Sequence, residues 1–173
     1  MVGTINDANY VGNASGSLVI TKAAQTITFD ALTPVTFGGA PFDLTATTTS
    51  PLSVSLVSSN LNVATISGTK VTIIGAGETT ISASQDGNSN YSAAASVSRT
   101  LTVNKAAASV ALSNLAQTYS GTAKNPTATT ALVASLPVTF AYSPGGATAP
   151  INVGSYGVTA TINHPNYAGS STG

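Results

Sequence analysis

The sequence contains no cysteine and no tryptophan, and it contains a single histidine. Without cysteine, disulfide bonds and thiolate metal sites are excluded. Charged residues make up only 6% of the chain, whereas an average globular domain has roughly 25%. Five basic residues balance five acidic residues. No basic surface is therefore available to attract a phosphate backbone, and we expect no nucleic-acid partner.

The sequence also lacks an apolar run long enough for a membrane-spanning helix, which needs roughly 18 apolar residues in succession. Apolar runs such as 71–74 have the length of a strand and contain threonine. The polar surface must consist of Ser, Thr, Asn and Gly rather than charged residues. Threonine favours β-structure because β-branched side chains pack well on a sheet. We therefore expect an all-β protein without membrane insertion.

A stretch at the start of the chain returns twice in later parts of the sequence. INDANYVG, from Ile5, resembles INHPNYAG, from Ile162. SGSLVITKAA, residues 15–24, resembles SRTLTVNKAA, residues 98–107. The two copies of INDANYVG lie outside the two copies of SGSLVITKAA in the sequence. Two kinds of unit therefore alternate along the chain.

We interpret residues 1–22 as the displaced end of a preceding unit, 23–105 as the first complete unit, and 106–173 as the second. The counterpart of Leu18–Lys22 would fall after Gly173. The second unit is therefore expected to lack its final strand in this sequence. We interpret the chain as a piece of a longer exported protein.

Short runs with alternating apolar side chains predict strands in both units. Residues 64–66 and 70–74 flank Ser-Gly-Thr, which predicts a β-hairpin with Gly68 at its turn. Short strands separated by frequent turn signals indicate two tandem immunoglobulin-like β-sandwiches. The other expected strands are 25–29, 42–46, 54–57 and 79–84 in the first unit, and 109–112, 138–142 and 156–162 in the second.

Two known families resemble these segments. NVATISGTKVTIIGAGETTISAS, residues 62–84, resembles the C-terminal half of bacterial immunoglobulin-like domains. QTYSGTAKNPTAT, from Gln117, and INVGSYGVTATINHPNY, from Ile151, resemble the mostly-β, glycine-rich MBG repeats. Ser120 stands where the MBG pattern has aspartate, so a role of that carboxylate is not carried over. The resemblance implies an extracellular or cell-surface, adhesin-like bacterial protein and brings no catalytic residues.

No segment predicts a catalytic, metal or cofactor site. DGNSN, from Asp86, begins like a calcium loop but lacks the closing glutamate, so we interpret it as a polar turn. His164 is the only histidine and lies before a proline in an expected loop. We expect that the protein is not an enzyme and needs no cofactor or metal.

Two recurring residue types call for an explanation. Tyr10, Tyr91 and Tyr167 share an asparagine-rich setting, and we interpret them as buried rings with hydroxyls bonded to the backbone. Lys22 and Lys105 end matching strands. A self-formed Lys–Asn cross-link is an alternative for them, but it needs a buried carboxylate, and solvated lysines are the favoured interpretation.

The second unit, with its final strand missing, would expose unpaired backbone groups and an apolar slot. We predict that Leu18, Val19, Ile20 and Thr21 fill this slot, with Leu18 and Ile20 pointing inward. Strand addition from another molecule gives a head-to-tail assembly. Closure within one chain is the alternative.

These observations favour a structural role, a stalk or spacer that associates with itself. The alternative function is binding of carbohydrate or of an ordered, ice-like surface, which Thr-x-Thr segments such as 26–28 and 45–47 suggest.

Overall fold

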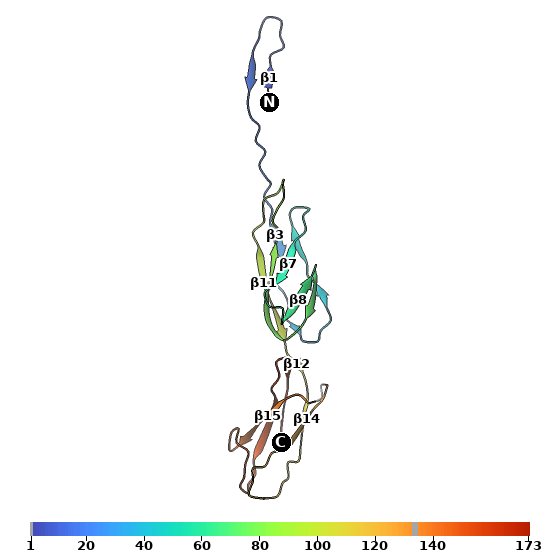
Figure 1. The fold of residues 1–173 in the computed structure, drawn as a ribbon, viewed down its shortest axis with the longest axis vertical. Helices are drawn as coiled ribbons and strands as arrows, with labels where there is room; N and C mark the ends of the chain where they lie inside the picture. Colours follow the sequence, from blue (N-terminus) through green and yellow to red (C-terminus); the bar gives the residue numbers. More distant parts are fainter. Residues whose placement is uncertain (1, 133–134) are drawn as a thin grey trace.

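The computed structural model describes residues 2–132 and 135–173. The described residues form strands and connecting loops without any helix, so no helix among them could cross a membrane. Figure 1 shows an elongated molecule in which an N-terminal segment, a first unit and a second unit follow one another along the long axis. The all-β prediction is confirmed.

The N-terminal segment, residues 2–22, consists of a hairpin and an extended run. Strands β1 (Val2–Thr4) and β2 (Asn13–Ser15) pair antiparallel, and the Ile5 amide donates a hydrogen bond of 3.0 Å to the Gly12 carbonyl. The hairpin lies at the top of Figure 1, and the extended run joins it to the first unit below. Every residue from 2 to 22 is exposed to solvent.

The first unit is a sandwich of two layers. One layer is the sheet β4–β11–β10–β7, formed by Val35–Thr36, Val97–Asn104, Gly77–Ser84 and Ser55–Ser58. The facing layer contains the pair β3–β6 (Ile27–Phe29, Ala46–Thr48) and the sheet β5–β9–β8 (Phe42–Asp43, Lys70–Ile73, Ala64–Ser67). Strand alternation points Ile81 and Leu101 into the core between the layers, where both are fully buried with Val71.

Two sequence predictions for this unit have different outcomes. The hairpin at Gly68 is confirmed, because β8 and β9 pair antiparallel and this glycine has a φ of +62°. The single strand expected over 42–46 is wrong. Strand β5 pairs with β9 and β6 pairs with β3, so the chain changes partner between them, and buried Leu44 lies at the crossing.

The second unit has three small sheets and a smaller core. They are the parallel pair β12–β17 (Ala106–Ala107, Tyr167–Ala168), the antiparallel pair β13–β14 (Val110–Ser113, Thr127–Thr130), and the sheet β15–β16–β18 (Val138–Ser143, Gly157–Ile162, Ser170–Thr172). Ala108, Val110, Leu136, Ala160 and Ile162 form its buried core.

The expectation that the second unit lacks its final strand needs a correction. Strand β18 pairs antiparallel with β16, with Thr172 opposite Thr159. It lies beside β16 as β11 lies beside β10 in the first unit, but β11 also pairs with β4 on its other side. The final strand therefore begins within this sequence and has three residues, whereas β11 has eight.

Candidate strand-acceptor groove and inter-unit joint

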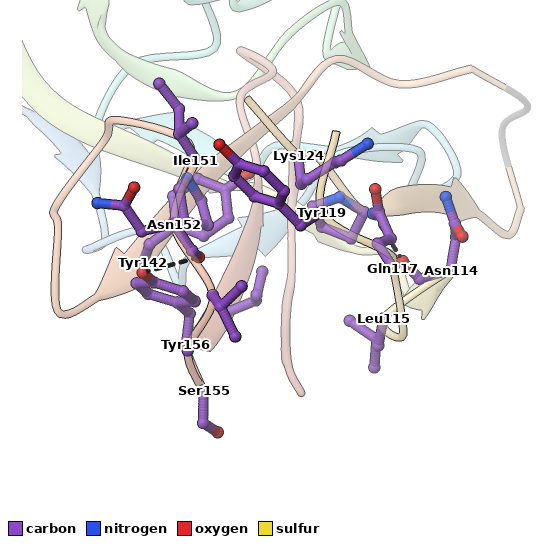
Figure 2. Close-up of a pocket in the computed structure, with 15 residues that line it drawn as sticks. Asn114, Leu115, Gln117, Tyr119, Lys124, Tyr142, Ile151, Asn152, Ser155 and Tyr156 are labelled. Carbon is purple, nitrogen blue, oxygen red and sulfur yellow. Dashed lines mark hydrogen bonds between the residues drawn. The ribbon is translucent and has the colours of Figure 1, made fainter. Parts of the chain in front are cut away.

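A groove of about 350 Å³ opens in the second unit, between the loop that follows β13 and the segment that precedes β16. Figure 2 shows its two walls. Side chains of the loop after β13, including Leu115 and Tyr119, form one wall, and Ile151, Asn152 and Tyr156 form the other. Tyr142 and Val158 also line the groove. It therefore lies directly against the second unit's sheet.

The groove begins where β18 ends. The Val158 and Gly173 backbones exchange two hydrogen bonds of 2.9 Å, which close the β16–β18 ladder. In the first unit the corresponding ladder continues, because Thr79 pairs with Leu101 and Gly77 with Val103. In the described part of the chain, no strand pairs with residues 153–156 of the second unit. This backbone edge is available to another strand.

Aromatic side chains shape the floor and one wall of the groove. Tyr142 is buried, and its hydroxyl donates a 2.7 Å hydrogen bond to Asn125 Oδ1. Burial raises the pKa of Tyr142 above its usual value of 10.0. The Tyr156 hydroxyl donates to the Asn152 carbonyl at 3.2 Å, and its ring lies over Gly154, where an added Cβ would approach it to 3.1 Å. An apolar side chain entering the groove would meet these rings.

The candidate strand-complementation residues lie outside this groove in the same molecule. Leu18, Val19 and Ile20 are 71%, 75% and 85% exposed, and Thr21 is also exposed. They belong to the extended run at one end of the molecule, whereas the second unit forms the other end (Figure 1). In this structure, therefore, the segment does not fill the groove of its own chain.

A joint connects the first unit to the second through the loop before β17. Asn166 Oδ1 accepts a 2.8 Å hydrogen bond from the Ala76 amide, in the turn before β10. The Tyr167 ring packs edge-on against the Phe37 ring, with centroids 5.5 Å apart and planes at 86°. Such an arrangement is a favourable geometry for an aromatic pair. The contacts join Asn166 and Tyr167, at the start of β17, to two separate loops of the first unit.

His164 and Lys105 also belong to this joint. Lys105 Nζ donates to the His164 carbonyl at 2.8 Å, and His164 Nδ1 accepts a 3.1 Å hydrogen bond from the Asn166 amide. The His164 ring lies 5.2 Å from the Tyr167 ring. Both side chains thus hold the loop that carries Asn166. Among the described residues no group of three or more His, Cys, Asp or Glu side chains is placed to hold a metal ion.

The interpretation of the repeated tyrosines as buried rings is wrong. Tyr10 is 71% exposed, and Tyr91 and Tyr167 are half-buried. Tyr167 packs against the core of its own unit and also against Phe37 of the neighbouring unit. The joint was not predicted from the sequence, although the repeated Asn-Tyr pairs 90–91 and 166–167 mark its position.

The Asn-Tyr pair of the first unit has the same local structure. Ala23 bridges to Tyr91 in parallel, as Ala106 does to Tyr167, and its amide donates to the Asn90 carbonyl at 2.8 Å. The Asn90 amide bonds to the Asn88 side chain, as the Asn166 amide does to His164. This loop lies at the end of the first unit that faces the N-terminal segment (Figure 1).

Comparison with known proteins agrees with the repeat pattern. A comparison with curated proteins finds no match. The sequence profile of the MBG domain matches residues 1–24 and 108–173, which together make up more than half of the chain. The matched residues lie in the N-terminal segment and in the second unit, and the match does not include the first unit between them. The chain therefore belongs to the MBG domain family.

Proposed function

We propose that this chain is a structural repeat module, a stalk or spacer, of an exported or surface-anchored bacterial protein. In this proposal, residues 23–105 are a bacterial immunoglobulin-like domain and residues 106–173 an MBG repeat. The module binds copies of itself head to tail by strand complementation. The proposal includes no catalytic role, cofactor or metal.

The joint between the units carries this proposal. Its hydrogen bond from Ala76 to Asn166 and its Phe37–Tyr167 contact come from two separate loops of the first unit, in addition to the covalent connection at Lys105. Contacts from two loops restrict bending more than a single covalent link does. Units held in line give the elongated shape seen in Figure 1, which suits a spacer that holds another domain away from a cell.

The surface chemistry is consistent with an extracellular location. The chain has equal numbers of acidic and basic residues. It has no cysteine, so its fold does not depend on disulfide formation after export. MBG family membership supports a surface protein. Protease treatment of intact cells that carry the full protein should remove this module, and its protection inside the cells would contradict the location.

Small-angle X-ray scattering tests the spacer role. We expect a particle whose maximum dimension matches the two units and the N-terminal segment in line. A dilute sample must be used so that self-association does not lengthen the particle. A compact particle, or a broad distribution of angles between the units, would contradict the proposal.

Self-association has a separate test. Molar mass measured by light scattering should rise with concentration for the full chain. A chain without residues 1–21 should remain monomeric at the same concentrations, because the donor strand is absent. Equal molar masses for the two proteins would contradict strand complementation and leave the spacer role standing.

Binding of carbohydrate or an ordered surface is the second candidate function. Thr139, Thr161 and Ser170 form a row of exposed hydroxyl side chains across β15, β16 and β18. The groove adds the exposed ring of Tyr119, which a sugar could contact. A glycan array tests the groove, and a thermal-hysteresis measurement tests the hydroxyl row. Signals in neither assay would eliminate this candidate.

A further inference from the structure

We infer that the groove of the second unit binds residues Ser17–Lys22 of a second copy in one fixed register. Leu18 lies opposite Tyr156, Val19 opposite Ser155 and Ile20 opposite Gly154. This inference rests on the self-association in the proposed function and specifies its site, partner segment and geometry.

The strands β7, β10 and β11 of the first unit correspond to β15, β16 and β18 of the second, and this correspondence defines the register. Strands β10 and β16 align with Ile81 at Val158 and Ala83 at Ala160, and all four side chains are buried. With this alignment, Gly77 corresponds to Gly154. In the first unit Val103 lies opposite Gly77. The residue that completes the second unit opposite Gly154 must therefore be the counterpart of Val103.

The repeat identifies this counterpart. SGSLVITKAA at 15–24 aligns with SRTLTVNKAA at 98–107, so Ile20 corresponds to Val103 and Leu18 to Leu101. Leu101 and Val103 are 0% and 2% exposed in the first unit. Leu18 and Ile20 are 71% and 85% exposed in the N-terminal segment. The two apolar side chains of the motif are therefore buried in the copy at 98–107 and exposed to solvent in the copy at 15–24.

Strand β18 gives an independent determination of the register. Thr172 lies opposite Thr159, and each further residue of an antiparallel strand moves one position back along its partner. The third residue beyond Thr172 is then opposite Tyr156. The motif around Tyr10 places Ser15 at the position of Thr172, and the third residue after Ser15 is Leu18. Both determinations place Leu18 opposite Tyr156.

The register puts each donor side chain in a matching environment. Residues directly opposite each other in an antiparallel pair point to the same face. Tyr156 belongs to the core face, so Leu18 and Ile20 enter the groove between Leu115 and the tyrosine rings. Val19 and Ser155 share the outer face, as Thr102 and Glu78 do in the first unit, where the two side chains are hydrogen-bonded at 3.2 Å.

The opposite wall of the groove supplies a second set of contacts. In the first unit β4 pairs in parallel with the end of β11, and the Phe37 amide donates to the Asn104 carbonyl at 2.9 Å. Val-Thr-Phe at 35–37 corresponds to Gln-Thr-Tyr at 117–119. The Tyr119 amide would then donate to the carbonyl of Thr21 from the second copy. The donor strand is bonded along both edges.

The docked copy also reproduces the joint. Its Asn90 and Tyr91 correspond to Asn166 and Tyr167, and Tyr119 corresponds to Phe37. The Tyr91 ring of the second copy would therefore pack against Tyr119, which is 60% exposed in the free chain. The donor end and the acceptor end are different surfaces at opposite ends of the molecule (Figure 1). The contact is heterologous and extends into a linear chain of copies.

The N-terminal hairpin competes with this contact. Strand β18 already occupies the position in the acceptor that corresponds to β2 of the donor. When the donor strand pairs with β16 of the acceptor, the donor hairpin must turn away from the acceptor's sheet at Gly16. This is the point at which β18 of the acceptor ends. Removing residues 1–16 eliminates this crowding and retains the donor strand. We expect such a chain to associate more tightly than the full chain.

Cysteine pairing tests the register in the full chain, which has no cysteine of its own. Ser155 and Val19 would form a non-hydrogen-bonded pair, whose Cα atoms lie about 4.5 Å apart, within disulfide range. We expect a mixture of Val19→Cys and Ser155→Cys chains to form a disulfide-linked dimer on mild oxidation. Both substituted residues are exposed, so neither change disturbs the free chain. The matched control is Val19→Cys with Thr159→Cys, four residues along the same strand and roughly 13 Å away.

The outcomes separate this inference from the proposed function. A linked dimer from the 19–155 pair, with little from the 19–159 pair, supports the register. Concentration-dependent association without 19–155 linkage overturns the register and leaves self-association standing. A monomer at every concentration, with neither pair linked, overturns both. Linkage of both pairs at equal rates indicates random collision and overturns the register.

Discussion

Truncation of Leu18 and Ile20 to alanine should weaken association without weakening the fold. Both side chains are mostly exposed in the free chain, so their loss changes its stability by no more than about 0.5 kcal/mol. In the docked strand they occupy the positions of Leu101 and Val103, which are buried. Truncation of a buried leucine or isoleucine costs roughly 2–5 kcal/mol.

The lower end of that range applies because an open groove can relax around a smaller side chain. Each substitution then costs about 2 kcal/mol and weakens association roughly 30-fold. The double variant loses about 4 kcal/mol, or nearly three orders of magnitude. Val19→Ala is the matched control, because Val19 is equally exposed in the free chain and points outward in the docked strand.

Light scattering across a concentration series measures the association, and thermal unfolding verifies the fold. Because no charged side chain lies on the donor strand between Ser17 and Thr21, the result should depend little on ionic strength. If Val19→Ala weakens association as much as Leu18→Ala or Ile20→Ala, the assignment of inward and outward faces is refuted. Unchanged association in the double variant refutes the role of the strand itself.

Three further predictions concern the joint and the two folds. Asn166→Ala removes the acceptor for the Ala76 amide and should broaden the angles between units in small-angle scattering, whereas Asn163→Ala, at an exposed neighbour, should not. Gly87→Ala should destabilise the first unit by about 2 kcal/mol in urea unfolding, because φ is +77° and the new Cβ would collide with the Tyr91 carbonyl. Gly68→Ala has a similar φ but open space, so it should cost less, and equal costs would refute the collision. Burial raises the pKa of Tyr142, so the stability it contributes is complete below the usual pKa and is lost as pH rises above about 10. Tyr142→Phe should reduce this alkaline loss, as measured by unfolding at a series of pH values, and an unchanged slope would contradict it.

The strand pattern could be predicted from local sequence because side-chain alternation reports which face is buried. Val138–Ser143 and Gly157–Ile162 form strands close to the predicted ranges, and the hairpin at Gly68 was also predictable from its turn residues. The shortest strands were missed. Strands β12 and β17 have two residues each, which is too few to show a period.

The function of the repeated asparagine and tyrosine could not be predicted from the motif alone. Recurrence identified Tyr91 and Tyr167 as residues with a shared role, but burial within a unit and packing against a neighbour produce the same sequence pattern. The Phe37 ring that Tyr167 contacts lies 130 positions earlier in the sequence. Only the spatial arrangement of the units brings the two rings together.

The sequence by itself determined the all-β class, the alternation of two kinds of unit and the identity of the displaced strand motif. These properties depend on periodicity and on similarity between segments, which need no coordinates. The tertiary structure decided where β18 ends, which groove lies beyond it and which rings form the joint. These properties depend on pairing between distant segments, and the same local sequence Leu-x-Ile or Leu-x-Val is buried in one place and exposed in the other because only one of them has a partner strand.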